Sequence, residues 1–255
     1  MKAPWLISQR PDPGARHRLF CFPFAGGSAS VYHAWPRLAP RHLHVCGVEY
    51  PGRGARLREE PHLALPPLVQ GLADLLEPML TRPYAFFGHS MGGLVAFELV
   101  RTLRERGARL PDHLFISATL APGRRSGRRS LAGATDQEVL EELRDLGGTP
   151  PELLADAELM ALTARTLRAD YTALGTYEYR DGDPLQVPFT VFGGWADPIA
   201  SPSDLRGWRT HSAVGCRFRF FPGDHFYLTG AAPDILRLVG QTVDDEPAGV
   251  PVATG

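Results

Sequence analysis

An apolar run, Tyr84-Ala85-Phe86-Phe87, leads into Gly88-His89-Ser90-Met91-Gly92 and then into a helical run, Leu94-Val95-Ala96-Phe97-Glu98-Leu99-Val100. This order predicts a strand, a tight turn and a helix. In such a turn only glycine avoids clashes on either side of the serine, and the hydroxyl projects from the top of the sheet. The helix directs unpaired N–H groups and a partial positive charge at the same point. The pattern therefore predicts that Ser90 is a nucleophile.

Strand and helix signals alternate along most of the chain. Apolar runs that predict strands lie at 19–22, 44–48, 84–87, 114–118, 189–192 and 216–221, and helical periodicity lies at 31–38, 65–80, 94–106, near 205 and at 226–243. Strands that are largely apolar and alternate with helices indicate a mostly parallel central sheet with helices on both faces. The predicted fold class is α/β, in a single domain over residues 1–245, since no linker divides the chain.

The alternation stops between Pro122 and Asp183, where the sequence predicts helices but no strand. Helical periodicity occurs at 135–146 and 159–174, and Thr135 with Glu138 is typical of a capping box. We interpret residues 122–183 as a helical lid inserted over the carboxyl edge of the sheet, where open α/β sheets bind ligands. The Pro-, Gly- and Ala-rich tail at 246–255 is expected to be disordered.

The composition is that of an ordinary soluble protein, with 44% hydrophobic and 22% charged residues among 255. A formal net charge of −1, with no basic stripe, gives no indication of a nucleic-acid partner. Cys21, Cys46 and Cys216 lie in apolar runs without metal-ligand spacing, which favours small core residues in a reducing compartment. No signal peptide and no apolar run of roughly 18 residues is found, so we expect a cytoplasmic protein without a membrane partner.

A serine hydroxyl needs a base, usually histidine, that is held by a carboxylate. In this architecture the order along the chain is serine, acid, histidine, and only His113, His211 and His225 follow Ser90. His225 comes directly after the last predicted strand, so it leaves the sheet at the same edge as Ser90. We predict that His225 is the base; the structural alternative is a histidine that caps the final helix.

The acid is expected at the same edge, one strand earlier. Asp197 lies in the loop after the predicted strand 189–192, and its structural alternative is an Asx turn before Pro198. Asp181 and Asp183 are the second-choice candidates for the acid, but both precede that strand and are expected at the opposite edge of the sheet. His89 leaves the turn in a different direction from Ser90, so we interpret it as a packed polar residue that supports the turn.

An oxyanion formed by attack on a carbonyl needs two preorganised N–H donors. Met91, at the start of the helix, is expected to supply one of them. The second is expected from the loop after the first strand, where Ala25 can approach closely because the neighbouring glycines lack side-chain bulk. Spacing alone leaves open which of Phe24, Ala25 and Gly26 donates.

Several short motifs follow one another along the chain. They are Phe22-Pro23-Phe24-Ala25-Gly26-Gly27-Ser28-Ala29, Tyr50-Pro51-Gly52-Arg53-Gly54, Phe87-Gly88-His89-Ser90-Met91-Gly92-Gly93, Gly193-Gly194-Trp195-Ala196-Asp197 and Gly223-Asp224-His225-Phe226-Tyr227. Together, in order from about residue 17 to 240, they resemble the type II thioesterases, which are stand-alone α/β-hydrolases associated with polyketide synthases and non-ribosomal peptide synthetases. The Gly-x-Ser-x-Gly motif alone indicates a hydrolase, and the block at 50–54 narrows the resemblance to this branch.

The resemblance implies an α/β-hydrolase fold and hydrolysis of acyl thioesters on the phosphopantetheine arm of an acyl or peptidyl carrier protein. The usual role of such enzymes is to remove stalled or wrong acyl groups during the biosynthesis of polyketides or non-ribosomal peptides, and hence of antibiotics. The resemblance further implies a monomer. No metal or organic cofactor is expected, because neither the formation of an acyl-Ser90 ester nor its hydrolysis by water needs one. By position, the triad of the family matches Ser90, Asp197 and His225, and its oxyanion hole matches Ala25 and Met91.

Two kinds of alternative remain open at this point. A carboxylesterase or an acyltransferase would use the same triad, and the relative turnover of thioesters and oxygen esters distinguishes them. A binding module that has lost catalysis on the same scaffold is disfavoured, because such modules usually lack the serine or the histidine and this chain has both.

Overall fold

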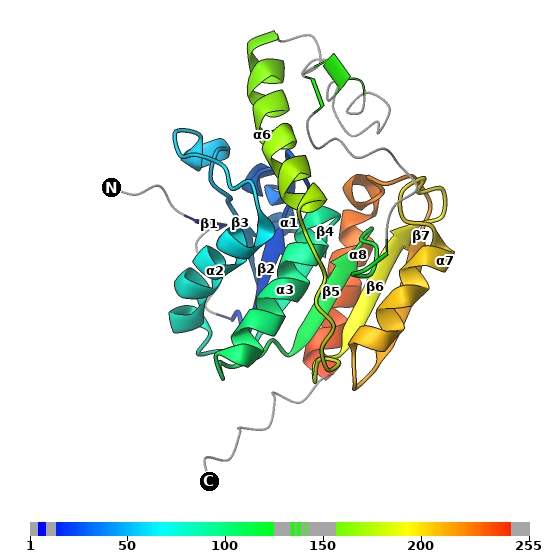
Figure 1. The fold of residues 1–255 in the computed structure, drawn as a ribbon. Helices are drawn as coiled ribbons and strands as arrows, with labels where there is room; N and C mark the ends of the chain where they lie inside the picture. Colours follow the sequence, from blue (N-terminus) through cyan, green and yellow to red (C-terminus); the bar gives the residue numbers. More distant parts are fainter. Residues whose placement is uncertain are drawn as a thin grey trace.

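A computed structural model of the protein describes residues 5–8, 14–124, 134–135, 137–138, 141 and 157–245 (Figure 1). Its centre is a seven-stranded sheet in the order β1-β3-β2-β4-β5-β6-β7. The strands are β1 (Leu6–Ser8), β2 (His17–Phe22), β3 (Leu43–Val48), β4 (Tyr84–His89), β5 (His113–Ser117), β6 (Phe189–Gly194) and β7 (Cys216–Phe221). All pairings are parallel except that of β1 with β3 at one edge. The predicted α/β class with a mostly parallel sheet is confirmed.

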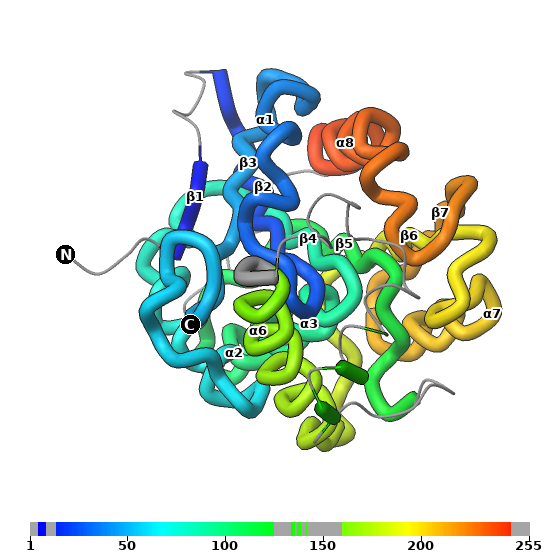
Figure 2. Tube along the Cα trace, turned by 90° about the horizontal axis from the view of Figure 1, so that it is seen from above, coloured from blue at the N-terminus to red at the C-terminus, as the bar shows by residue number. Residues whose placement is uncertain are grey.

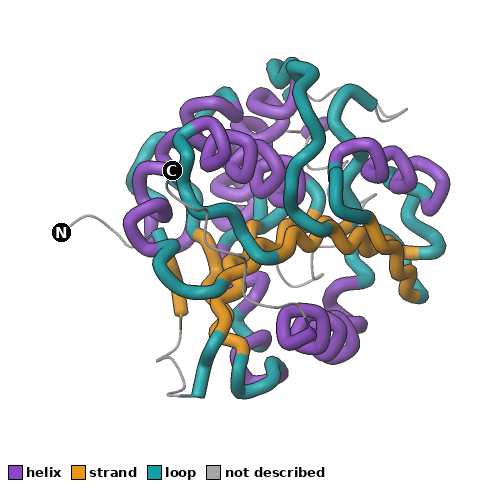
Figure 3. Tube along the Cα trace, turned by 90° about the horizontal axis from the view of Figure 1, so that it is seen from below, coloured by secondary structure: helices purple, strands orange, loops and turns teal. Residues whose placement is uncertain are grey.

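Helices cover both faces of this sheet (Figures 2 and 3). One face carries α2 (Leu65–Leu76), α3 (Met91–Glu105) and, after β6, α7 (Pro202–Leu205) with the 3₁₀ helix η4 (Arg206–His211). The other face carries α1 (Trp35–Leu38) and the final helix α8 (Leu228–Asp245). The long helix α6 (Ala157–Gly175) extends above the sheet, at the edge where the parallel strands end (Figure 1).

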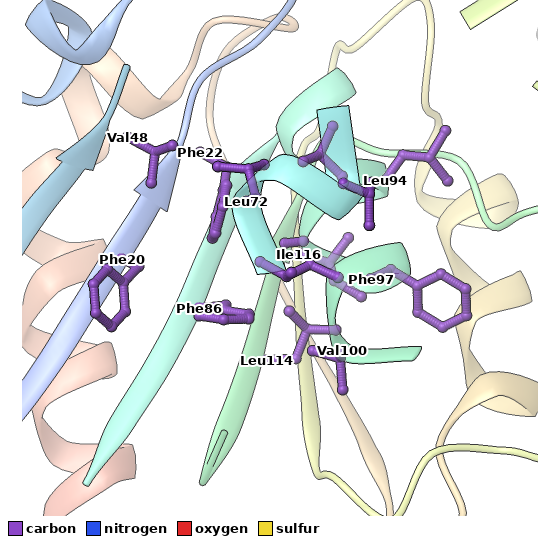
Figure 4. Close-up of a cluster of buried hydrophobic side chains, with 14 of the residues drawn as sticks. Phe20, Phe22, Val48, Leu72, Phe86, Leu94, Phe97, Val100, Leu114 and Ile116 are labelled. Carbon is purple, nitrogen blue, oxygen red and sulfur yellow. The ribbon is translucent and has the colours of Figure 1, made fainter. Parts of the chain in front are cut away.

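The buried side chains form one cluster on each face of the sheet. Phe20 and Phe22 of β2 point into the cluster beneath α2 and α3, where they meet Phe86 of β4 (Figure 4). The intervening Leu19 and Cys21 point into the cluster beneath α8. Full burial of each such large apolar side chain contributes about 1.5–3 kcal/mol. Because both faces of the central sheet are covered, β4, β5 and β6 are buried at every position, and their largely apolar sequences made them recognisable. The edge strand β7 differs, since its first five residues alternate between half-buried and exposed.

Two predicted helices are shorter than expected, and proline is the reason in each. The predicted helix 65–80 ends as α2 at Leu76 and continues as the 3₁₀ helix η3 (Glu77–Met79), because Pro78 lacks the N–H that the next α-helical bond needs. The predicted helix 31–38 is divided into η1 (Ala29–Tyr32) and α1, since an α-helix running through Pro36 would bring its ring against the carbonyl of Tyr32.

The strand β1 was not predicted. It has only three residues, and its side chains are half-buried or exposed, so it shows neither a continuous apolar run nor a clear alternation. Its place in the sheet comes from backbone pairing with β3, in which Leu6 lies opposite Val48. Such pairing leaves no signal in the side chains of a short edge strand.

The predicted helix 159–174 is found as α6, and the described residues between 122 and 183 contain no strand. The capping box is confirmed: the Thr135 N–H donates to Glu138 Oε2 (2.8 Å) and the Glu138 N–H donates to Thr135 Oγ1 (3.3 Å). Of the rest of the predicted helix 135–146, only residues 137, 138 and 141 are among the described residues. The tail 246–255 lies wholly outside them. Of the helices in the described ranges, none has the length and apolar character that crossing a membrane requires.

Candidate active site

Ser90 occupies a strained turn between β4 and α3. Its φ of 53° and ψ of −121° are unusual for a residue with a side chain. Hydrogen bonds hold the turn from both sides: the Ser90 N–H donates to the Ser117 carbonyl (2.8 Å), and the Ser90 carbonyl accepts from Thr119 Oγ1 (2.8 Å) and from the Gly93 N–H (2.9 Å). Strain that is held in this way is typical of functional sites.

The glycines on either side of Ser90 are required by close backbone contacts. A Cβ atom at Gly88 would lie 2.1 Å from the carbonyl oxygen of Gly92, and one at Gly92 would lie 2.1 Å from the carbonyl oxygen of Phe22. No side chain fits at such distances, because the obstructing atoms belong to rigid backbone. The expectation that only glycine is tolerated here is therefore confirmed.

His225 and Asp197 form a buried hydrogen-bonded pair at the carboxyl ends of neighbouring strands. Nδ1 of His225 lies 2.9 Å from Oδ2 of Asp197. The other carboxylate oxygen, Oδ1, accepts from the N–H groups of Ile199 (2.8 Å) and Ala200 (3.1 Å), so the plane of the carboxylate is fixed. The His225 ring lies beside the Ser90 turn, with its centroid 5.2 Å from that of the His89 ring.

The same contacts bear on the structural alternatives for these two residues. The bond from the Ile199 N–H to Oδ1 is an Asx turn, so Asp197 makes the local turn with one oxygen and holds His225 with the other. The local turn before α8 is made by Asp224, whose Oδ1 accepts from the Phe226 N–H (2.8 Å). His225 is therefore not needed for that turn.

The other candidate acids and histidines lie away from this site. Asp183 lies between α6 and the start of β6. Its carbonyl accepts a hydrogen bond from Arg104, which lies in the last turn of α3, at the opposite end of that helix from Ser90. Asp181 lies two residues before Asp183. His113 opens β5 at the amino edge of the sheet, where its Nε2 lies 2.9 Å from Thr190 Oγ1. His211 ends η4 and contacts the Tyr179 hydroxyl (3.3 Å).

His89 packs beneath the turn, as the sequence analysis expected. It is fully buried, and its Nδ1 lies 2.8 Å from Ser117 Oγ, which in turn lies 2.6 Å from the Tyr227 hydroxyl. This chain of polar groups joins β4, β5 and the segment that carries His225. Burial, and then the neighbouring His225, lower the pKa of His89 well below its ordinary value of 6.5.

This lowered pKa predicts a pH dependence of stability. The unfolded chain binds a proton at His89 as the pH falls below about 6.5, whereas the folded protein keeps this ring neutral. His89 therefore removes up to about 1.4 kcal/mol of stability per pH unit during acidification. In His89→Asn, whose amide still reaches Ser117, we expect urea unfolding to show a shallower loss of stability between about pH 7 and pH 5. Parallel curves for both proteins over that range would contradict the assignment.

The loop after β2 contains the candidate oxyanion donors. The N–H of Gly26 donates to Asp170 Oδ2 (2.7 Å), and the N–H of Gly27 donates to the Phe24 carbonyl (2.9 Å). Of the donors left open by spacing, Gly26 is thus already engaged, which leaves Phe24 and Ala25. Met91 is the first residue of α3, where the N–H has no partner within the helix.

Several residues around the site were given no role by the sequence analysis. Ser117, Thr119 and Tyr227 connect neighbouring strand ends by hydrogen bonds, a contact that no sequence spacing displays. Asp170 did leave a signal, because it stands three residues after Leu167 in the apolar stripe of α6 and is buried with it. A carboxylate in phase with apolar residues indicates a buried partner. Among the described residues, no cluster of histidine, cysteine and carboxylate side chains is arranged to hold a metal ion.

Comparison with known proteins agrees with this geometry. The family model described as "Thioesterase domain" matches residues 17–242. The gramicidin S biosynthesis protein GrsT of Aneurinibacillus migulanus is 38% identical over 235 residues, which cover 92% of each chain. Thioesterase PikA5 of Streptomyces venezuelae is 34% identical over 232 residues, covering 88% of this chain and 80% of PikA5.

The similar solved structures are thioesterases as well. The RedJ thioesterase from the prodiginine pathway of Streptomyces coelicolor is 39% identical, with a TM-score of 0.84 over 92% of this chain and 89% of RedJ. The type II thioesterase BorB from the borrelidin cluster is 37% identical, with a TM-score of 0.84 over 94% of this chain and 97% of BorB. The chain therefore belongs to the thioesterase family and is a thioester hydrolase with the α/β-hydrolase fold, similar to the type II thioesterases of polyketide and non-ribosomal peptide pathways.

Proposed function

We propose that this protein is a type II thioesterase that hydrolyses acyl groups from the phosphopantetheine arm of acyl or peptidyl carrier proteins, removing aberrant acyl groups. Relatives from gramicidin S, prodiginine, borrelidin and yersiniabactin biosynthesis support this assignment. The observation that carries it is the buried pair of His225 and Asp197, 2.9 Å apart, beside the strained turn of Ser90.

In the first half of the proposed reaction, Ser90 Oγ attacks the thioester carbonyl while His225 Nε2 accepts its proton. The oxyanion of the tetrahedral intermediate is stabilised by the N–H groups of Met91 and Ala25. When the intermediate collapses, the C–S bond breaks and the protonated His225 returns the proton to the departing sulfur. A thiol is much more acidic than an alcohol, and a free cysteine has a pKa of about 8.5, so a thiolate leaves far more readily than an alkoxide.

In the second half, a water molecule takes the place of the carrier thiol. His225 accepts a proton from this water as it attacks the acyl-Ser90 ester, and the same N–H donors hold the new oxyanion. His225 then protonates Ser90 Oγ, and the free acid departs. Asp197 keeps the His225 ring in the tautomer that has a free Nε2, because its Oδ2 accepts the Nδ1 proton.

The remaining features of the proposal concern the whole molecule. We place a single domain over residues 1–245 and a lid at 122–183, of which α6 is the described helix. The free thiols of the buried Cys21 and Cys46 favour a reducing compartment, in agreement with a cytoplasmic protein. A monomer is proposed, because the reaction requires residues of one chain only.

The direct test is a panel of carrier proteins that bear different acyl groups on phosphopantetheine. We expect the wild-type protein to release free acid and the carrier thiol, both followed by intact-protein mass spectrometry, whereas Ser90→Ala releases neither. Turnover of many acyl groups at comparable rates supports removal of aberrant groups, and a strong preference for one group indicates product release.

The carboxylesterase and acyltransferase alternatives that the sequence left open are tested with the same assay. A carboxylesterase would hydrolyse an oxygen ester of the same acyl group faster than the thioester. An acyltransferase would form an ester with an added alcohol in preference to the free acid. Either result would overturn the proposed hydrolysis of carrier thioesters.

A further inference from the structure

A buried ion pair joins two segments that are far apart in the sequence. Arg53, in the turn after β3, holds Asp170 of α6 through two parallel hydrogen bonds, from Nη1 to Oδ2 (2.6 Å) and from Nη2 to Oδ1 (2.7 Å). The two side chains are only 6% and 3% exposed. The Asp170 carboxylate helps to raise the pKa of Arg53 above its ordinary value, although burial alone would lower it.

The same two side chains also hold the backbone of the loop after β2. Asp170 Oδ2 accepts the N–H of Gly26 (2.7 Å), and Arg53 Nη1 donates to the carbonyl of Gly27 (3.2 Å). The helix and the loop are in close contact here, since a Cβ atom at Gly26 would lie 3.0 Å from Leu167 Cδ1. Seen from above in Figure 2, α6 lies beside this loop.

The position of these bonds matters because Ala25 precedes Gly26 directly. Fixing the N–H of Gly26 fixes the peptide that joins it to Ala25, and the bond from the Gly27 N–H to the Phe24 carbonyl closes the turn on the other side. The direction of the Ala25 N–H then follows from the backbone on both sides of it. The first of these two bonds is accepted by a residue of α6, 144 positions further along the chain.

Stability alone does not explain such a pair. Removing two charges from water has a cost in free energy that their mutual attraction often only offsets, and apolar residues of the same volume are frequently as stable. What apolar residues do not supply is an acceptor for the Gly26 N–H and a donor for the Gly27 carbonyl. The arrangement therefore determines orientation.

We propose that Asp170 and Arg53 are positioning residues for the oxyanion hole, so that α6 must be seated on the loop after β2 for the Ala25 N–H to face the reacting carbonyl. This inference rests on the proposed function, in which Ala25 stabilises the oxyanion. It makes one helix of the proposed lid a part of the catalytic arrangement. In this proposal Asp170 contributes to stabilisation of the transition state and not to binding of the substrate.

The test is Asp170→Asn, which keeps the shape of the side chain but removes the charge and one acceptor. We expect kcat for a thioester to fall by about 10- to 100-fold with KM within about twofold, since misplacing one oxyanion donor acts on the transition state. A trifluoromethyl ketone analogue, which forms an oxyanion on attachment to Ser90, should bind more weakly by a similar factor. The final extent of Ser90 labelling by a fluorophosphonate gives the concentration of folded active sites, to which each kcat is normalised.

The chain offers a matched control on the same helix. Arg165 of α6 and Glu60 form an ion pair of 2.8 Å between α6 and the segment that follows Arg53, but their side chains are 49% and 87% exposed. Arg165→Gln should leave kcat and analogue binding unchanged. Equal losses in Arg165→Gln and Asp170→Asn would show general loosening of α6 and would overturn the proposal.

Further outcomes keep the inference separate from the proposed function. If the wild-type protein hydrolyses thioesters and Asp170→Asn does so at the same kcat, only this inference fails, even where the variant melts earlier. If kcat is kept and KM rises, α6 serves binding alone and the inference again fails. Should Asp170→Asn not fold, Arg53→Lys retains the charge without the paired geometry, and about a three- to tenfold loss of kcat is expected. An unchanged kcat in Arg53→Lys would then count against the proposal.

Discussion

Ser90→Ala is expected to lower kcat for thioester hydrolysis by about 10⁶-fold, because no acyl-enzyme forms without the nucleophile. The fold should survive the change. The Ser90 side chain makes no capping bond to α3, and the turn is held by the backbone of Ser90 through Ser117, Thr119 and Gly93. Release of acid from an acylated carrier protein, followed by mass spectrometry, measures the loss.

The control for this change is Ser30→Ala. Ser30 is exposed in η1, close to the loop after β2, and its hydroxyl lies 2.7 Å from that of Ser28, its one hydrogen-bond partner within the described part of the chain. We expect wild-type turnover for Ser30→Ala and nearly equal melting temperatures for all three proteins. Near-normal turnover by Ser90→Ala would remove Ser90 from the reaction and with it the proposed mechanism.

A double variant tests whether Ser90 and His225 act as one unit. If His225 serves only to move the proton of Ser90 and of the attacking water, Ser90→Ala with His225→Ala should be no slower than Ser90→Ala alone. Multiplying losses would instead indicate that His225 has an independent role. The comparison uses residual rates above the uncatalysed hydrolysis of the same thioester.

The positions of Ser90, Asp197 and His225 could be predicted because parallel strands impose them. Every parallel strand ends at the same edge, so a residue that directly follows such a strand lies near the others that do. The central strands themselves were recognisable, since burial on both faces leaves largely apolar runs in the sequence. The short loops after β6 and β7 then leave little freedom for Asp197 and His225.

Contacts between a helix and a distant loop could not be predicted in the same way. The periodicity of α6 indicates which face is buried, but it does not indicate what that face meets. Arg53 was part of a recognised motif and Asp170 was part of a predicted helix, yet their pairing across 117 positions needed the structure. For the same reason, spacing did not show that Gly26 is already engaged as a donor.

Asp197→Asn is expected to lower kcat by about 10⁴-fold while leaving the fold intact. The backbone N–H groups of Ile199 and Ala200 both point at Oδ1, so the asparagine turns its oxygen toward them. Its NH₂ group then faces Nδ1 of His225, where the carboxylate oxygen had been. Nδ1 must accept this bond, the ring proton moves to Nε2, and His225 loses its ability to accept the proton of Ser90.

The matched control is Asp224→Asn, one residue before His225. Asp224 is exposed and accepts the Phe226 N–H through Oδ1, a bond that an asparagine oxygen makes equally well. We expect near-wild-type turnover from Asp224→Asn, and ¹⁵N shifts of the His225 ring that report the other tautomer only in Asp197→Asn. Turnover within tenfold of wild type in Asp197→Asn would mean that the proton moves without Asp197. In that case Asp197 would serve the packing of the β6 and β7 loops and would not be needed to hold the tautomer of His225.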